Sequence, residues 1–468
     1  MKQIIGSSVF LAGLWVVLFF SFLFVGKSLW WPVRIGMLVI AVVLLVRVVR
    51  FAVSKPKYFI FACVIVAINW VVIELAAVVF ERGYLAKHPV YGRGRHLSLS
   101  EEQRVTVERR LSGDGGFYRF DPLLGWAIIP NGDNGIHRAN SRGMRGDREY
   151  EESVPEGVTR VICCGDSYTF CAEVENGETW QEYAEGADEG YEFLNLGLAA
   201  AGLAQAYVRY RELGSQFESD YVFIGYMTNN IQRTVNVFRP FLYRDTGAVA
   251  AKPYAALDEE GELVVHPNPL DTEEKFRGLL DNTEEVLAEL GEKDYYVQLQ
   301  KRARPLLPSG HVWRYLSGEF GAGNYVRKVF SLPRKGHVRE FEIANDYLEG
   351  SYPLEVVSRL FDQFVEEVEA NGARPVIVIF PNREDMDDYN EGKPKGHATL
   401  LERLDEAGHE YIDVLDLMVD HYGDVIPDET MFVESHYNGE TNRLLGLAFL
   451  DYLRGLSPDG GEGEPGGE

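Results

Sequence analysis

Cysteine is scarce in this chain, which has only four cysteines in 468 residues. So few cysteines cannot form the disulfide framework of a small secreted protein. Cys163 and Cys164 lie inside an apolar run, and the sequence leaves open whether Cys171 pairs with either of them. Internal repeats, a phosphate-binding loop and the ligand spacings of zinc sites are also missing. Repeat architectures and the common nucleotide and zinc modules are therefore excluded, and we expect no metal ion and no cofactor.

Outside the N-terminal part, basic residues are far fewer than acidic residues. Residues 1–90 contain nine Lys or Arg and two Asp or Glu, whereas the remainder contains 37 basic and 69 acidic residues, a net charge of −32. A body this acidic repels phosphate backbones, so we expect no nucleic acid as a partner. The simplest role of the acidity is solubility.

Long apolar runs are confined to the N-terminal part, and they predict membrane helices. Residues 4–26 form an uncharged run of 23 residues, longer than the roughly 20 that a spanning helix needs. The run lacks the cleavage pattern of a signal peptide. The second apolar run, at 35–46, is shorter than a spanning helix needs, but Trp and Arg residues flank it as interfacial anchors. The third run, at 58–80, is long enough to span, although it includes Glu74. We therefore predict a membrane segment with three transmembrane helices over residues 1–82.

The basic residues between these predicted helices indicate their orientation. The second connection carries Arg47, Arg50, Lys55 and Lys57, and the first carries Lys27 and Arg34. Positive connections stay in the cytoplasm, so the C-terminal part is expected on the extracytoplasmic side. If residues 35–46 did not span, that part would be cytoplasmic. The prediction is a multi-pass protein of the cell membrane, held in the lipid bilayer by its N-terminal helices.

From residue 159 onward, short buried strands alternate with amphipathic helices. Strands are predicted at 160–164, 192–195, 221–226, 374–380 and 411–415, and helices at 178–185, 203–217, 354–370, 400–407 and 439–453. This alternation is typical of an α/β fold with a central parallel sheet that is covered on both faces. We divide the rest of the chain into a linker and short-strand approach region at 83–158, an α/β domain at 159–455 with an insertion at about 235–345, and a disordered acidic tail at 456–468.

Four polar blocks follow predicted strands or precede predicted helices. They are Gly165-Asp166-Ser167, residues 195–202, Thr228-Asn229-Asn230 and residues 434–438. The carboxyl ends of parallel strands share one edge of a sheet, so these blocks are expected to converge there. Each block by itself is common, but their order along the chain is specific.

In content and order the four blocks resemble those of the SGNH/GDSL hydrolase superfamily, and the chain is similar to its membrane-anchored bacterial members. The resemblance covers residues 121–453, including Asp-Pro-Leu-Leu-Gly-Trp at 121–126 and Asn-Ser-Arg-Gly-Met-Arg-Gly at 140–146, and it weakens in the insertion. It implies a flavodoxin-like, three-layer SGNH fold preceded by the transmembrane helices. It also implies a serine hydrolase that acts on ester bonds.

The resemblance assigns roles that the chemistry of ester cleavage also requires. Ser167 would be the nucleophile, and His436 would take its proton and return it to the leaving alcohol. The family usually has an Asp two or three residues before the histidine. Here Val433 stands at minus three and Glu434 at minus two. Glu434 is therefore the candidate acid that orients the imidazole, with a backbone carbonyl as the alternative.

The oxyanion hole would combine three donors. They are the Ser167 backbone N–H, a backbone N–H from the second block and an asparagine amide from the third. The glycine usual in the second block falls on Ala200, with Gly202 two residues beyond, and alanine suits the role if its φ is negative. Ungapped counting places the amide on Asn229, and a one-residue shift would place it on Asn230.

These features predict an esterase that removes O-acyl groups, most simply acetyl, from an envelope or extracellular glycan; an acylated carbohydrate is the expected partner. One alternative is an acyltransferase that passes the group to a polysaccharide through the same site. Another is a binding subunit of an envelope assembly whose hydrolase fold has lost its activity. Val433 and Ala200 favour the last alternative, whereas the presence of Ser167, Asn229 and His436 argues against it.

Overall fold

The computed structural model describes residues 54, 56–83, 98–113, 116–243, 246–302, 346–423 and 425–456. The described residues belong to two compact units, one containing helix α3 (Pro56–Gly83) and the other containing the described residues from 98 onward. The predicted helices at 4–26 and 35–46, much of the insertion and tail residues 457–468 lie outside the described residues.

The third apolar run is helical, because α3 (Pro56–Gly83) covers the whole of 58–80. Large apolar side chains such as Ile60, Trp70 and Val79 are exposed on this helix. Among the helices of the described residues, none combines the length and apolar character that crossing a membrane requires.

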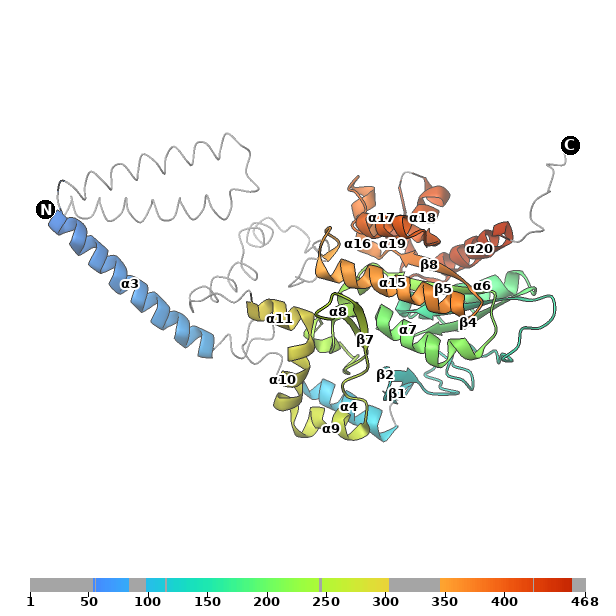
Figure 1. Ribbon diagram of the computed structural model, residues 1–468, viewed down its shortest axis with the longest axis horizontal. Helices are drawn as coiled ribbons and strands as arrows, with labels where there is room; N and C mark the ends of the chain where they lie inside the picture. Colours follow the sequence, from blue (N-terminus) through green and yellow to red (C-terminus); the bar gives the residue numbers. More distant parts are fainter. Residues whose placement is uncertain are drawn as a thin grey trace. The chain divides into compact units, whose positions relative to one another are not determined.

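The second unit is built on a sheet of five parallel strands. These are β3 (Thr159–Gly165), β4 (Tyr191–Gly197), β5 (Tyr221–Met227), β8 (Arg374–Phe380) and β9 (Tyr411–Asp413), in the spatial order β4-β3-β5-β8-β9. Figure 1 labels β4, β5 and β8 of this sheet. Counted along the chain, this order is 2-1-3-4-5, which is the flavodoxin-like arrangement. The connections reverse direction between β3 and β5, and ligands bind at the carboxyl edge of such a switch point. The predicted α/β fold with a central parallel sheet is confirmed.

Helices cover both faces of the sheet because alternate strand residues point to opposite sides. On β3, Ile162 and Cys164 belong to one hydrophobic cluster, and Val161 and Cys163 belong to the other. The first cluster includes α7 (Leu203–Glu212), α15 (Tyr352–Ala370) and α17 (Ala398–Ala407). The second includes α6 (Trp180–Ala187), α18 (Val414–Tyr422) and α20 (Gly439–Leu456). Cys163, Cys164 and Cys171 are all free thiols, so Cys171 pairs with neither strand cysteine.

Two predicted elements end earlier than expected. The strand predicted at 411–415 stops at Asp413, because the Asp413 side chain accepts a hydrogen bond from the Leu415 N–H at 3.0 Å and caps α18. The helix predicted at 203–217 stops at Glu212 and is followed by a 3₁₀ turn, η3 (Gly214–Gln216). A Cβ at Gly214 would lie 2.7 Å from the Tyr210 ring, so only glycine lets the chain turn this closely.

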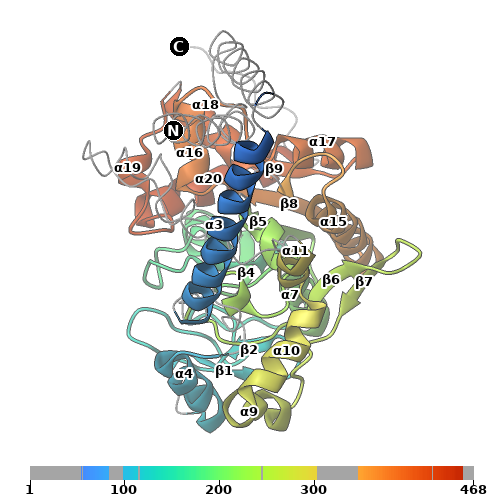
Figure 2. The same ribbon diagram turned by 90° about the vertical axis from the view of Figure 1, so that its left-hand side faces the viewer.

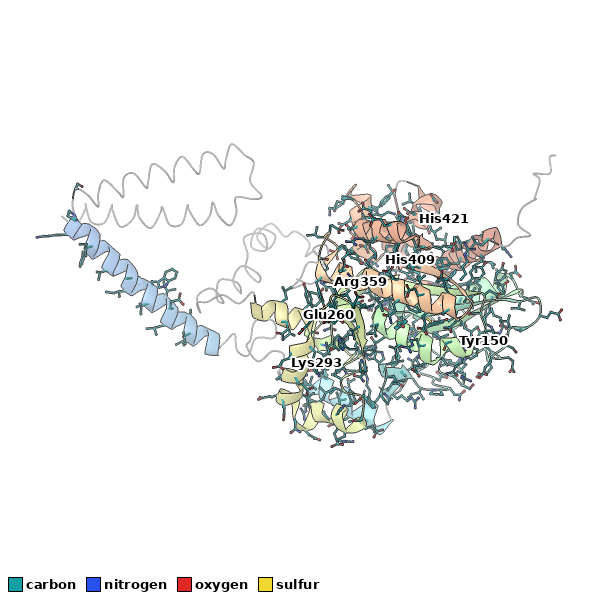
Figure 3. All side chains as sticks on the ribbon, in the orientation of Figure 1. Tyr150, Glu260, Lys293, Arg359, His409 and His421 are labelled. Atoms are coloured by element: carbon teal, nitrogen blue, oxygen red, sulfur yellow. The ribbon has the colours of Figure 1, made fainter. Side chains whose placement is uncertain are left out.

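The approach region and the insertion pack on each other. The approach region contributes α4 (Glu101–Ser112), β1 (Tyr118–Asp121) and β2 (Gly125–Ile128). The insertion contributes β6 (Tyr254–Leu257), β7 (Leu263–His266), α9 (Glu273–Asp281), α10 (Thr283–Lys293) and α11 (Tyr295–Arg302). Phe120 of β1 stacks on Phe276 of α9 at 4.7 Å. Arg104 of α4 donates to the Leu280 carbonyl of α9 at 2.9 Å, so α4 and α9 lie side by side (Figure 2). Charged side chains such as Glu260 and Lys293 face solvent from the insertion (Figure 3).

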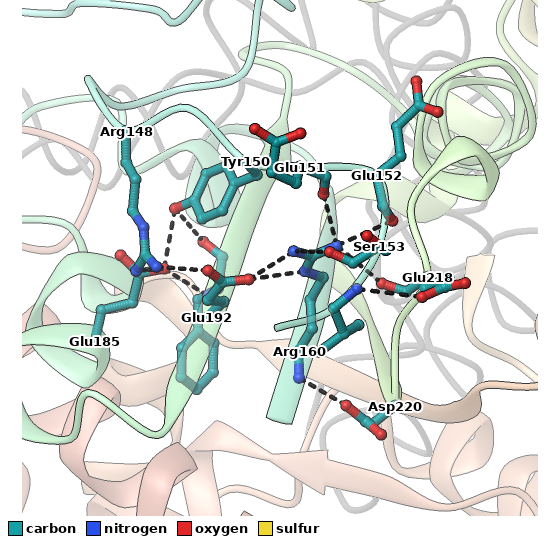
Figure 4. A network of polar contacts seen from close by, with 12 residues as sticks. Arg148, Tyr150, Glu151, Glu152, Ser153, Arg160, Glu185, Glu192, Glu218 and Asp220 are labelled. Carbon is teal, nitrogen blue, oxygen red and sulfur yellow. Dashed lines mark hydrogen bonds and ion pairs between the residues drawn. The ribbon is translucent and has the colours of Figure 1, made fainter. Parts of the chain in front are cut away.

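A network of ion pairs fastens the approach region to the amino ends of β3 and β4 (Figure 4). The fully buried Arg160 donates to Glu192 at 2.9 and 2.7 Å. Its other N–H groups reach the backbone carbonyls of Glu151, Glu152, Ser153 and Glu218. Arg148 pairs with the second Glu192 oxygen at 2.5 Å. Because every donor of this buried cation has a partner, the network holds the chain that leads into the sheet.

Candidate active site

Ser167 lies at the carboxyl end of β3, where the chain turns into the short helix α5 (Ser167–Phe170). The Asp166 carboxylate caps this helix by accepting the Tyr168 N–H at 2.7 Å. A Cβ at Gly165 would come within 2.1 Å of the Thr169 hydroxyl, so glycine is needed for the turn. Burial raises the pKa of Asp166, and nearby Arg233 opposes that rise. Ser167 is therefore placed at the switch point of the sheet, as the first residue of a capped helix.

His436 reaches Ser167 from the loop between α19 (Asp428–Met431) and α20. Its Nε2 lies 2.7 Å from the Ser167 Oγ, although the two residues are 269 positions apart. The Tyr168 hydroxyl donates to the Ser435 carbonyl at 2.9 Å and ties this loop to the serine helix. His409, labelled in Figure 3, lies outside this group and pairs with Asp362 at 2.6 Å.

The carboxylate on the far side of His436 belongs to Glu173, whose Oε1 lies 2.9 Å from Nδ1. Glu173 Oε2 also accepts the backbone N–H groups of Glu434, Ser435 and His436, at 2.8, 2.9 and 3.1 Å. The Ser435 hydroxyl donates to Oε1 at 2.7 Å. Burial raises the pKa of Glu173, but the hydrogen bonds from His436 and from this loop outweigh burial and hold the pKa well below its usual range. Glu173 is thus ionised and fixed beside the imidazole.

The prediction that Glu434 is the acid is wrong, because Glu173 makes the contact with His436. The loop turns so that its N–H groups converge on Glu173, and the Glu434 side chain is exposed. The family pattern places the acid shortly before the histidine, and Glu173 does not lie there. Glu173 follows the serine block instead, two residues after Cys171, which has a φ of 59° and ends α5. No sequence signal separates Glu173 from the nearby Glu175.

The two asparagines after β5 have different partners. Asn230, at the start of α8 (Asn230–Val235), donates its amide to the Asp166 carboxylate and is 1% exposed. Asn229 precedes α8, and its Oδ1 accepts a hydrogen bond from Asn382 Nδ2 at 3.3 Å. Asn230 is therefore committed to Asp166, and Asn229 is the better candidate for an oxyanion donor.

The second block differs from the expectation in its backbone. Ala200 has a φ of 65°, in the left-handed region, and not the negative value expected for an alanine. The Ala201 N–H donates to the Leu198 carbonyl at 3.1 Å, so Ala200 is the third residue of a β-turn, where a positive φ is typical of a type II turn. A glycine would fit there without strain.

Only one of the two backbone candidates in this block is available. The Gly202 N–H donates to Gln205 Oε1 at 3.1 Å, and this bond removes Gly202 as a donor. Within the part of the chain that the structure describes, the Ala200 N–H makes no hydrogen bond. Strained residues of this kind often occur at functional sites. Ala200 therefore remains the candidate backbone donor.

The arrangement suits nucleophilic catalysis. A serine hydroxyl, an imidazole and an ionised carboxylate lie in one hydrogen-bonded row, so the imidazole can accept the serine proton while the carboxylate stabilises the resulting cation. Among the described residues, no cluster of His, Cys, Asp or Glu is arranged to hold a metal ion.

Comparison with protein-family models and with curated protein sequences found no match. Among solved structures, the chain is similar to a protein described as lipolytic and of the G-D-S-L family from Desulfitobacterium hafniense DCB-2, with 12% identity and a TM-score of 0.29, over 63% of this chain and 98% of that chain. It is also similar to a member of the lipolytic protein G-D-S-L family from Veillonella parvula DSM 2008, with 12% identity and a TM-score of 0.29, over 63% of this chain and 97% of that chain. Because these values are low, the function proposed below depends on this chain's own site.

Proposed function

We propose that the chain is a serine hydrolase of the SGNH/GDSL type that cleaves carboxylic esters. The observation that carries the proposal is the continuous row of hydrogen bonds from Ser167 through His436 to Glu173, with distances of 2.7 and 2.9 Å. The three residues come from two segments far apart in the sequence, and ordinary packing does not require them to meet. A turn serine or a structural histidine alone would not need an ionised carboxylate behind it.

In the proposed reaction, Ser167 Oγ attacks the ester carbonyl while His436 Nε2 takes its proton. The negative oxygen that develops would be stabilised by the Ser167 and Ala200 N–H groups and by the Asn229 amide. His436 then passes the proton to the leaving alcohol. Water, activated by the same imidazole, hydrolyses the acyl-enzyme and frees Ser167. Glu173 remains ionised throughout and stabilises the imidazolium cation.

The proposed substrate is an O-acyl group, most simply acetyl, on a glycan outside the cytoplasmic membrane. Support comes from the apolar runs at 4–26 and 35–46, which would place the chain at a membrane, and from the basic residues that follow the second run. Fusion of a reporter to the C-terminus tests the location. A reporter active only in the cytoplasm would refute the extracytoplasmic placement.

The test of the activity uses the purified full chain in detergent. It should release acetate from p-nitrophenyl acetate and from an acetylated polysaccharide, and a serine-directed phosphonate should label the peptide that contains Ser167. The Ser167→Ala variant should lose both properties, whereas Ser215→Ala, a change at an exposed serine, should keep both. Transfer of acetyl to an added glycan in preference to water would identify an acyltransferase. Absence of labelling and of both activities would refute a catalytic role.

A further inference from the structure

Asn382 begins α16 (Arg383–Asn390) at the carboxyl end of β8, and its amide orientation is determined by backbone groups. Its Oδ1 accepts the Glu384 N–H at 2.7 Å, which caps the helix. Its own N–H donates to Asp385 Oδ2 at 2.8 Å. Because a backbone N–H can only donate, the oxygen of the Asn382 amide must face Glu384. The Nδ2 group therefore points the other way.

Both hydrogens of Asn382 Nδ2 have acceptors. One goes to the Thr228 hydroxyl at 3.0 Å and the other to Asn229 Oδ1 at 3.3 Å. The Thr228 hydroxyl donates its own hydrogen to Asp385 Oδ2 at 2.6 Å, so it can only accept from Asn382. The direction of every hydrogen bond in this set follows from the first one, at the Glu384 N–H.

This sequence of bonds also determines which end of the Asn229 amide is the oxygen. If the Asn229 amide were turned over, its NH₂ group would face the NH₂ group of Asn382, and two donors would meet. The observed arrangement presents the oxygen to Asn382 and directs the Asn229 NH₂ group away from it. An oxyanion donor needs this end of the amide, because the amide oxygen would repel a developing negative charge.

We propose that Asn382 is a positioning residue that sets the Asn229 amide for oxyanion stabilisation, and this inference depends on the proposed function. Asn382 acts only through Asn229 and does not touch the substrate. Its removal should therefore affect the transition state more than substrate binding, so kcat should fall while KM changes little.

Two variants test the proposal while keeping the cap of α16. Asp and Ser are both good N-cap residues, so Asn382→Asp and Asn382→Ser retain an acceptor for the Glu384 N–H and remove the amide NH₂ group that donates to Asn229. The Ser variant adds no charge. Each should lower kcat for p-nitrophenyl acetate roughly 10²-fold, which is the usual effect of losing one oxyanion donor. KM and the melting temperature should stay near the values of the unmodified chain.

Asn371→Asp is the matched control, since Asn371 donates to the Tyr210 hydroxyl at the other end of β8 and lies outside the proposed site. This variant should keep its kcat. In an Asn229→Ala background, Asn382→Ser should lower kcat by less than about a further threefold, because the effects of two residues that act through one another are not additive.

The inference is refuted if either Asn382 variant keeps a near-normal kcat, or if Asn382→Ser causes the same large loss in the Asn229→Ala background. Phosphonate labelling distinguishes these failures from failure of the proposed function. Labelled Ser167 with unaffected Asn382 variants refutes the positioning role alone. An unmodified chain that is neither labelled nor active refutes the proposed function, and the positioning role is refuted with it.

Discussion

Replacing Glu173 by glutamine should abolish most of the activity, for a reason that the hydrogen bonds of this carboxylate make specific. Glu173 Oε1 accepts from His436 Nδ1 and the Ser435 hydroxyl, and Oε2 accepts three backbone N–H groups. A glutamine has only one acceptor oxygen. The orientation that keeps the three backbone bonds turns its NH₂ group toward His436, and the imidazole is then held in the wrong tautomer. Carboxylate-to-amide changes in serine triads lower kcat by about 10⁴-fold.

The assay is steady-state hydrolysis of p-nitrophenyl acetate by the full chain, with Glu434→Gln as the matched control. The control removes an exposed carboxylate two positions before His436 and should lower kcat less than about tenfold, the loss expected of a residue outside the triad. Phosphonate labelling of Ser167 should slow strongly in Glu173→Gln and stay near normal in Glu434→Gln. A large loss in Glu434→Gln together with near-normal turnover in Glu173→Gln would show that this assignment of the acid is wrong.

The remaining predictions concern other parts of the same domain. Asn229→Ala should lower kcat by roughly 10²–10³-fold. Asn230→Ala should lower the melting temperature more than Asn229→Ala does, because it leaves the buried Asp166 without its amide partner. Ala200→Gly should relieve the left-handed strain and raise the free energy of unfolding by up to about 1 kcal/mol with unchanged turnover, as denaturant titration would measure. Glu192→Ala should lower the free energy of unfolding by about 3–5 kcal/mol, because it leaves buried Arg160 unpaired; a loss under about 1 kcal/mol would contradict this account of the network. The pKa of Glu173 is lowered in the folded state, so the ionised carboxylate stabilises the fold above the unfolded pKa of about 4.3, and this stabilisation is lost as the pH falls below that value. Between pH 7 and 3 the melting temperature should therefore fall more steeply for the unmodified chain than for Glu173→Gln.

The sequence alone determined the strands and helices of the sheet and the positions of the polar blocks along it. Apolar residues of a buried strand alternate between two covered faces, so the runs from 159 onward predict strands without knowledge of their neighbours. β5 and β8 lie within one residue of the predicted limits. Gly165 is required partly for a local reason, because a Cβ there would meet the Thr169 side chain four residues on; the Gly225 carbonyl of β5, 2.8 Å from such a Cβ, adds a tertiary reason.

Only the tertiary structure decided which polar groups meet. The acid beside His436 comes from a residue 263 positions earlier in the chain, because the N–H groups of the 434–436 loop converge on Glu173 and leave the Glu434 side chain outside. The difference between Asn229 and Asn230 likewise depends on partners that follow other strands, Asn382 after β8 and Asp166 after β3. Local patterns depend on forces between neighbours in the sequence. The identity of a hydrogen-bond partner depends on where two distant loops end and which way each one turns, and spacing along a single chain does not contain that information.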